Sequence, residues 1–395
     1  IKNLALTFNL WQQTKFLRKL QFELTNRLFK YYLKSDYIFF LRTNSAHLYR
    51  NLTEIIGAYL DYISRYMVLL SEGIIFIGVV LVLFYVDFLG TIIILFSICI
   101  VGSAIYLLTK KKLTFFGEER NIIGGELNKH LLQGMASAKD VKILDREEDL
   151  IYQVNKNLFK FTRLNHIIKF IDGLPRFLFE ILTVSAFLAL VLSMMSLKRD
   201  VVDIILYLSV FAVAAFRIIP AASRILNAMQ MIRFQEPAVK LLLQEFNFKD
   251  NSYLKKNYQP KKGSIPLKFQ KEINLKNLSF SYPVRKEFSL SKISMTVKKG
   301  DIIGIIGETG SGKSTLINLF TGLLKPSEGK IEVDGLNIFS NLSEWHKKIG
   351  YVPQSIYLMD DTIKKNIAFG LREDDIDDNS IKQAVDEASL SEFLK

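Results

Sequence analysis

Long apolar stretches dominate the first half of the chain. Four of them hold about 20 predominantly apolar residues each, which is the length of a helix that crosses the hydrocarbon core of a bilayer. They cover residues 68–86, 88–109, 175–197 and 204–222. The opening run IKNLALTFNLW is too short to cross alone and indicates the end of a further helix. The pattern predicts an all-α polytopic transmembrane domain over residues 1–246.

The segments between these stretches alternate in charge. Lysine and arginine are concentrated in residues 15–50 and 110–169, and the positive-inside rule therefore places both segments in the cytoplasm. Apolar positions recur at helical spacing in LTNRLFKYYLKSDYIFFL and in HLLQGMASAKDVKILDREEDL, so we expect the membrane helices to extend into the cytoplasm. The short links near residues 86–90 and 198–203 are expected outside, although Lys198 and Arg199 depart from the rule.

The pattern changes after the last helical run, which continues to about Phe246. Residues 247–272 are polar and contain Pro and Gly, which indicates a linker. From Ile273 the spacing becomes strand-like in INLKNLSFSYP, and the apolar run DIIGIIG at residues 301–307 predicts a short buried strand. A loop and a helix from about Ser314 follow. Residues 273–395 are therefore predicted to form the first part of an α/β domain, which makes the chain a multidomain membrane protein.

Composition and charge agree with a membrane protein. Hydrophobic residues make up 49% of the chain, and the net charge is +13. Because the basic residues are concentrated in the cytoplasmic segments and no nucleic-acid-binding motif occurs, we expect no nucleic-acid partner. The single cysteine, Cys99, excludes an intramolecular disulfide and is expected to be a buried, inert thiol.

The stretch GIIGETGSGKST carries the clearest chemical signal. Gly307, Gly312, Lys313 and Ser314 match the pattern G-x-x-x-x-G-K-[ST], between a predicted strand and a predicted helix. Glycines let backbone N–H groups turn toward phosphates, and the helix N-terminus adds a positive field. Lys313 would contact the β- and γ-phosphates of ATP and Ser314 would ligate Mg²⁺, while Gly310 and Thr315 complete the expected nucleotide-binding loop. The alternative is a glycine-rich turn.

With these motifs in place, the second half of the chain resembles the nucleotide-binding domain of an ABC transporter. The resemblance implies that Tyr282, in FSYP, stacks on adenine; the alternative is a tyrosine buried in a strand. It also implies that Gln354, in YVPQ, is the Q-loop glutamine, which contacts Mg²⁺ and the attacking water. Lys313 and Gln354 are therefore the expected catalytic residues, and Ser314 and Gln354 the expected metal ligands. The run SIYLMDDTIKKNIAFG resembles the exporter branch of the family.

The first half is similar to an ABC exporter membrane domain from the end of its second helix through its sixth. Coupling helices are then implied near residues 34–42 and 138–148. The runs GLPRFLFEIL and AFRIIPAASRILNAMQMIRF are most similar to bacterial flippases for lipid-linked oligosaccharides. This resemblance implies a homodimeric half-transporter of the bacterial cytoplasmic membrane, with its nucleotide-binding domain in the cytoplasm. It would be an ATPase that exports or flips an amphipathic substrate, a lipid-linked oligosaccharide or polysaccharide precursor, across that membrane, with membrane lipid as a further partner. Export of a peptide, drug or lipid A-like glycolipid is an alternative, as is an ATP-gated channel or regulator.

The sequence also departs from the family pattern. It contains no LSGGQ signature, no Walker B strand ending in Asp-Glu and no switch histidine, because His346 in SEWHKKIG does not match that motif. We therefore expect a fragment that lacks the first helix and the C-terminal part of the ATPase domain. Such a polypeptide would bind ATP weakly at best and would be inactive alone.

Ionisable residues inside predicted spans are candidates for substrate contact, because they are costly there. Arg217 follows thirteen uncharged residues in the last span and would meet an anionic group such as a pyrophosphate; alternatively, its side chain reaches the cytoplasmic interface. Glu180 lies one helical turn after Arg176, which predicts a structural ion pair. Arg224 is expected on the cytoplasmic continuation of the last helix.

Overall fold

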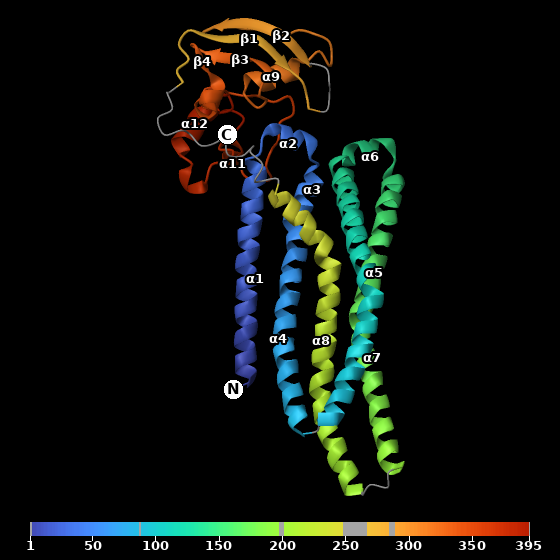
Figure 1. Cartoon of the computed structure of the whole chain (residues 1–395). Coiled ribbons are helices and arrows are strands. Elements are labelled where there is room, and N and C mark those ends of the chain that lie inside the picture. Colours follow the sequence, from blue (N-terminus) through green and yellow to red (C-terminus); the bar gives the residue numbers. More distant parts are fainter. Residues whose placement is uncertain (1, 87, 197–200, 248–266, 284–288, 395) are drawn as a thin grey trace. The chain divides into compact units, whose positions relative to one another are not determined.

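The structure is a computed structural model that describes residues 2–86, 88–196, 201–247, 267–283 and 289–394. The chain divides into two compact units, Ile1–Gln259 and Pro260–Lys395. The first unit is helical, whereas the second contains a small sheet with short helices (Figure 1). Most of the predicted linker, residues 248–266, lies outside the described part of the chain.

Five long helices build the first unit, and short helices connect some of them at one end (Figure 1). The long helices are α1 (Lys2–Leu33), α4 (Ile56–Val86), α5 (Phe88–Ala136), α7 (Glu147–Ser196) and α8 (Val201–Asn247). The short elements are α2 (Tyr37–Arg42), α3 (Ser45–Arg50), the π-helix η1 (Asn51–Ile55) and α6 (Ala138–Leu144). Helices α2 and α6 lie within the two segments where coupling helices are predicted.

Helix α8 is the centre of the bundle, because it packs against α4, α5 and α7. Apolar side chains form separate layers along it. One layer includes Phe179, Ile218 and Leu226, all nearly inaccessible to solvent. A second layer joins Leu28 of α1 to Leu242 near the end of α8. The layers hold long helices together although much of the apolar surface faces outward, as expected for helices surrounded by lipid.

A close approach of α5 to α8 lies at a proline, Pro237. Pro237 has no N–H, so it cannot donate to the carbonyl oxygen of Arg233 one turn earlier. The hydroxyl of Thr114 on α5 lies 3.4 Å from that oxygen and 3.2 Å from the carbonyl oxygen of Lys110, so it is shared between them. Gly117 lies against the same turn, and a Cβ there would overlap the carbonyl oxygen of Phe234. The α8 ribbon changes direction toward its C-terminal end (Figure 1).

Two helical segments among the described residues are long and apolar enough to cross a membrane. They are Ser45–Tyr85 and Ile94–Ala136, and they overlap the predicted spans 68–86 and 88–109. The predicted spans 175–197 and 204–222 fall on α7 and α8; residues 197–200, between these helices, lie outside the described part. Cys99 is exposed on α5, so the expectation of a buried thiol was wrong. The side chain points outward from the bundle within a predicted span.

The second unit contains one antiparallel sheet with strand order β2-β1-β3-β4. Its strands are β1 (Glu272–Phe280), β2 (Leu290–Lys298), β3 (Glu328–Val333) and β4 (Leu336–Asn337). The helices are α9 (Lys313–Phe320), α10 (Leu342–His346), α11 (Ile363–Ile367) and α12 (Asp378–Glu387), with 3₁₀ turns η2 (Ile338–Ser340) and η3 (Glu373–Asp375). Leu278 of β1, Leu319 of α9 and Ile331 of β3 are completely buried. They belong to the buried apolar core of this unit.

The predicted buried strand at residues 301–307 does not form. The segment has no regular structure, and Ile302 and Ile306 are 100% and 98% exposed. A strand needs a neighbour for its N–H and C=O groups. Among the described residues, no strand of the sheet pairs with this apolar run, so its N–H and C=O groups have no strand partner.

Candidate functional site: a phosphate-binding loop

Glycine determines the shape of the loop that leads into α9. Gly310 and Gly312 have φ angles of 88° and 92°, which residues with a Cβ rarely adopt. Gly312 is also the N-cap of α9, and a Cβ on it would lie 2.7 Å from Leu290 Cδ2. The backbone therefore requires glycine at this position both for its conformation and for its close contact with β2.

Lys313 folds back over the loop. Its Nζ atom donates to the carbonyl oxygens of Gly307 (2.6 Å) and Glu308 (2.7 Å). A lysine ammonium has three N–H donors, so one remains for another acceptor, such as a phosphate oxygen. The loop thus holds a cation beside the N-terminus of α9, where the helix dipole also favours negative charge.

Tyr282 joins the end of β1 to the start of α9. Its hydroxyl lies 3.2 Å from Oγ1 of Thr315, within hydrogen-bond distance, and its ring packs edge-on against Phe280, with 4.9 Å between the ring centroids. The ring is half-buried and lies just past the strand. Ser314, the next residue after Lys313, is exposed and free to meet a ligand. The structure therefore brings Tyr282, Lys313, Ser314 and Thr315 together around one helix end.

Gln354 and Arg217 are not joined to this cluster. Gln354 is exposed in an irregular segment, and no hydrogen bond connects it to the loop among the described residues. Arg217 is exposed on α8, in the helical unit, and forms no ion pair with any described residue. Their roles remain predictions.

Two residues of α10, Trp345 and His346, contact the C-terminal end of α9. Trp345 Nε1 donates to the carbonyl oxygen of Phe320 (2.9 Å), and His346 Nε2 lies 2.9 Å from the carbonyl oxygen of Thr321. These carbonyls belong to the C-terminal end of α9, whose last four have no partner within the helix. The pair therefore fastens the far end of the helix that carries Lys313. Sequence patterns alone did not indicate this.

Metal binding at the loop would rely on few protein atoms. The described residues contain no group of three or more His, Cys, Asp or Glu side chains that could hold a metal ion. Mg²⁺ keeps several waters and is commonly held by one or two protein oxygens together with phosphate oxygens. The exposed hydroxyl of Ser314 fits that mode of binding, beside a loop built for phosphates.

The helical unit carries charged features of its own. Arg224 of α8 forms a two-pronged ion pair with Glu72 of α4, with N–O distances of 2.7 and 2.9 Å. The predicted pair between Arg176 and Glu180 is present, at 2.9 Å. Both pairs neutralise charges within or beside predicted spans, so their first role is structural.

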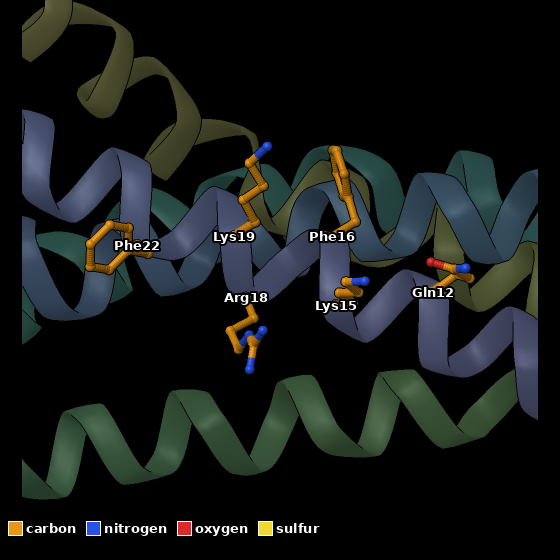
Figure 2. Close-up of a pocket in the computed structure, with 6 residues that line it drawn as sticks. All are labelled: Gln12, Lys15, Phe16, Arg18, Lys19 and Phe22. Carbon is orange, nitrogen blue, oxygen red and sulfur yellow. The ribbon is translucent and has the colours of Figure 1, made fainter.

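A basic and aromatic face lies on α1. Figure 2 shows Gln12, Lys15, Phe16, Arg18, Lys19 and Phe22, which line a hollow of about 570 Å³. The Lys15 ammonium lies 4.8 Å from the centroid of Trp11, a cation–π contact. Lysine and tryptophan together at one helical turn are typical of the boundary between membrane and water.

Comparison with known proteins agrees with this geometry. Residues 290–395 match the family described as "ABC transporter". A "Probable ABC transporter ATP-binding/permease protein" of Haemophilus influenzae is 25% identical over 73% of this chain and 50% of its own length. An "ATP-dependent lipid A-core flippase" of Pasteurella multocida is 37% identical over 31% of this chain and 21% of its own length. The structure entitled "Structure of a bacterial Atm1-family ABC exporter with ATP bound" superimposes with a TM-score of 0.76, at 18% identity over 99% of this chain and 67% of the other.

These findings confirm the predicted fold class, an all-α membrane-type domain followed by part of an α/β P-loop domain. The arrangement, a helical membrane-type unit followed by a unit that matches the ABC transporter family, is similar to that of these relatives. The chain spans about half the length of the Haemophilus influenzae relative, which it matches across both units.

Proposed function

We propose that the chain supplies the membrane domain and the phosphate-binding part of an ATP-driven exporter. One observation carries this proposal. Lys313 lies over a glycine loop at the start of α9, in the same chain as a bundle of helices long enough to cross a bilayer. A phosphate-gripping loop joined to membrane helices suits a protein that uses a nucleotide to change the conformation of those helices.

Each candidate site residue then has a distinct task. Lys313 and the first amides of α9 bind the phosphates, and the ring of Tyr282 stacks on the base. Ser314 would supply an oxygen ligand for Mg²⁺, and Gln354 would complete the metal site and orient the attacking water. Hydrolysis of bound ATP supplies the energy of transport. Gly307, Gly310, Gly312 and Thr315 keep the loop in the shape that these contacts need.

Movement is carried through the helical unit by its short connecting helices. Helix α2 lies between α1 and α4, and α6 lies between α5 and α7, so a displacement of either reaches two long helices at once. We propose that α2 and α6 are the coupling helices. Two copies of the chain form the transporter, and their membrane domains enclose one substrate cavity.

An amphipathic anion is the proposed cargo, most specifically a lipid-linked oligosaccharide or polysaccharide precursor. Arg217 would meet its pyrophosphate. The name of the Pasteurella multocida relative, a lipid A-core flippase, supports a lipid-like substrate. The protein would work in the cytoplasmic membrane of a bacterium. The alternative cargo is a peptide or drug. Measuring which substrate stimulates ATP hydrolysis by the intact protein in liposomes distinguishes the two classes of cargo. Stimulation by a short peptide, but not by a polyprenyl-pyrophosphate saccharide, would refute the lipid-linked cargo.

Nucleotide binding is the direct test of the proposed motor. A charged hydrogen bond contributes about 1.5–3 kcal/mol, so Lys313→Ala should weaken binding of a fluorescent ATP analogue by roughly ten- to hundred-fold. Lys348→Ala removes the same charge from an exposed position of the same unit and should leave binding unchanged. Equal affinity of the Lys313→Ala variant and the unmodified chain would contradict the assignment of the loop.

A further inference from the structure

Hydrogen bonds between helices mark the level at which the predicted spans end. Arg65 NH1 of α4 donates to Asn227 Oδ1 (2.9 Å), Asn227 Nδ2 donates to the carbonyl oxygen of Asp172 on α7 (2.8 Å), and Gln230 Nε2 donates to Thr109 Oγ1 of α5 (2.9 Å). Arg65, Thr109 and Asp172 each lie within one helical turn of the cytoplasmic end of a predicted span. The part of α8 from Asn227 to Gln230 is therefore level with the cytoplasmic edge of the hydrocarbon.

A hollow of about 460 Å³ opens one turn beyond this level, between α5 and α8. Its lining consists of Lys110, Lys111, Thr114, Phe115, Glu118 and Arg233. Three cations thus face one carboxylate. No ion pair joins Lys110 or Lys111 to an acidic residue in the part of the chain that the structure describes. The hollow therefore has an excess of positive charge at the depth where lipid phosphates lie.

Arg233 is held in position from two sides. Its Nε atom donates to the hydroxyl of Tyr106 (2.9 Å), and one terminal nitrogen donates to Glu236 Oε2 (3.1 Å). Glu236 is also paired with Lys240, at 3.0 Å, so the charge of that carboxylate is shared with a second cation. A guanidinium has five N–H donors, which leaves donors of Arg233 for an external anion.

The same hollow offers apolar surface. Phe115 belongs to its lining and is 59% exposed. A ligand with a phosphate and an apolar tail would satisfy both features, whereas free phosphate would use only the cations. Basic pockets between membrane helices on the cytoplasmic side are typical sites for anionic lipid headgroups.

We propose that the α5–α8 hollow binds the headgroup of an anionic phospholipid from the cytoplasmic leaflet. Lys110, Lys111 and Arg233 contact its phosphate, and Phe115 contacts the glycerol end of its chains. The site depends on the predicted orientation of the spans and is independent of nucleotide binding. A loss of ATP binding would therefore leave it intact.

Photo-crosslinking tests the proposal with the full chain. The chain is reconstituted in vesicles that contain either photoactivatable phosphatidylglycerol or photoactivatable phosphatidylcholine, and adducts are mapped by peptide mass spectrometry. Phosphatidylglycerol adducts are expected in residues 106–118 and 230–240, in clear excess over phosphatidylcholine adducts. Each removed cation should lower that excess about five-fold, so Arg233→Gln is the first variant and a double Lys110→Gln, Lys111→Gln variant is the second.

Two variants serve as controls. Arg233→Lys keeps the charge and should retain most of the excess, while Lys142→Gln removes a charge from exposed α6 and should change nothing. Circular dichroism establishes that each variant is helical. Equal labelling by the two lipids, or an unchanged excess in helical Arg233→Gln, would overturn the proposal. Displacement of the adducts by a polyprenyl-pyrophosphate saccharide, but not by added phosphatidylglycerol, would also overturn it and assign the hollow to the cargo.

Discussion

Glu245, near the end of α8, is the acidic residue whose surroundings allow the sharpest prediction. Its carboxylate accepts hydrogen bonds from the Tyr32 hydroxyl (3.3 Å) and from Asn51 Nδ2 (3.1 Å). Asn51 and Tyr32 are only 5% and 3% exposed, and Asn51 Nδ2 also donates to the Tyr32 hydroxyl (3.1 Å). Burial raises the pKa of Glu245, although the hydrogen bonds from Tyr32 and Asn51 and the charge of Arg50 oppose that rise.

This direction of shift determines how stability depends on pH. Because the folded protein holds the Glu245 proton more tightly than the unfolded chain does, the stabilisation is complete below the ordinary pKa of glutamate. It is lost as pH rises through the raised pKa. Glu245→Gln stays neutral throughout. Its amide can still accept from Asn51 and donate to the Tyr32 hydroxyl, so the difference in Tm, variant minus unmodified chain, should increase with pH.

Glu245→Ala should behave differently, because it removes the acceptor and leaves the buried amide of Asn51 with fewer partners. An unsatisfied buried polar group costs about 1–3 kcal/mol. For 150–250 residues, each kcal/mol corresponds to about 2–4 °C in Tm. The alanine variant should therefore melt several degrees lower at every pH between 5 and 8.

Thermal unfolding in detergent, followed by circular dichroism at 222 nm between pH 5 and pH 8, is the measurement. Glu23→Gln is the matched control, because Glu23 is exposed and lies 3.8 Å from Lys19 on α1. It should change Tm little, since such pairs contribute about 0–1 kcal/mol. A Tm difference for Glu245→Gln that stays flat or falls with rising pH would refute the reasoning.

Two further contacts, one in each unit, can be tested by substitution. Gly117→Ala forces a Cβ against the carbonyl oxygen of Phe234 and should lower the free energy of unfolding by about 1–3 kcal/mol. Gly57→Ala has no atom within 4 Å of the new Cβ and should instead stabilise its helix by roughly 0.5–1 kcal/mol. The opposite order of melting temperatures would contradict the α5–α8 contact. Trp345→Phe removes the 2.9 Å hydrogen bond to the carbonyl oxygen of Phe320 and should cost about 1 kcal/mol in chemical denaturation of the second unit. An unchanged denaturation midpoint would show that the end of α9 does not depend on it.

Elements that depend on local spacing were predictable from the sequence. The strand expected from Ile273 forms as β1, and the helix expected from about Ser314 begins at Lys313. The last long helix, expected to end at about Phe246, ends at Asn247. In each case the pattern of apolar positions and the residues at the boundary carry the information within a few turns of chain.

Features that depend on distant partners were not predictable. The apolar run at residues 301–307 satisfies a local rule for a buried strand, yet a strand forms only when another segment pairs with it. The π-helix η1 shows the same limit, because its first residue, Asn51, bonds to Tyr32 and Glu245, which are far away in the sequence. In the loop, the motif predicts which residues bind phosphate, but not the contact of Lys313 with carbonyl oxygens or that of Tyr282 with Thr315.

The continuity of α8 has a mechanical consequence. Its 47 residues, at 1.5 Å each, make a rod about 70 Å long, so a tilt of about 5° around its middle would move each end by roughly 3 Å. Pro220 and Pro237 each remove one backbone hydrogen bond, and stiffness is therefore lowest beside these two residues. Near Pro237, contacts with Thr114 and Gly117 of α5 restrain bending, and beside Pro220 the buried Ile218 belongs to the same apolar layer as Phe179 of α7. A force applied at the end near Asn247 would thus be passed to α5 near Pro237 and to α7 near Pro220, as well as along α8 itself.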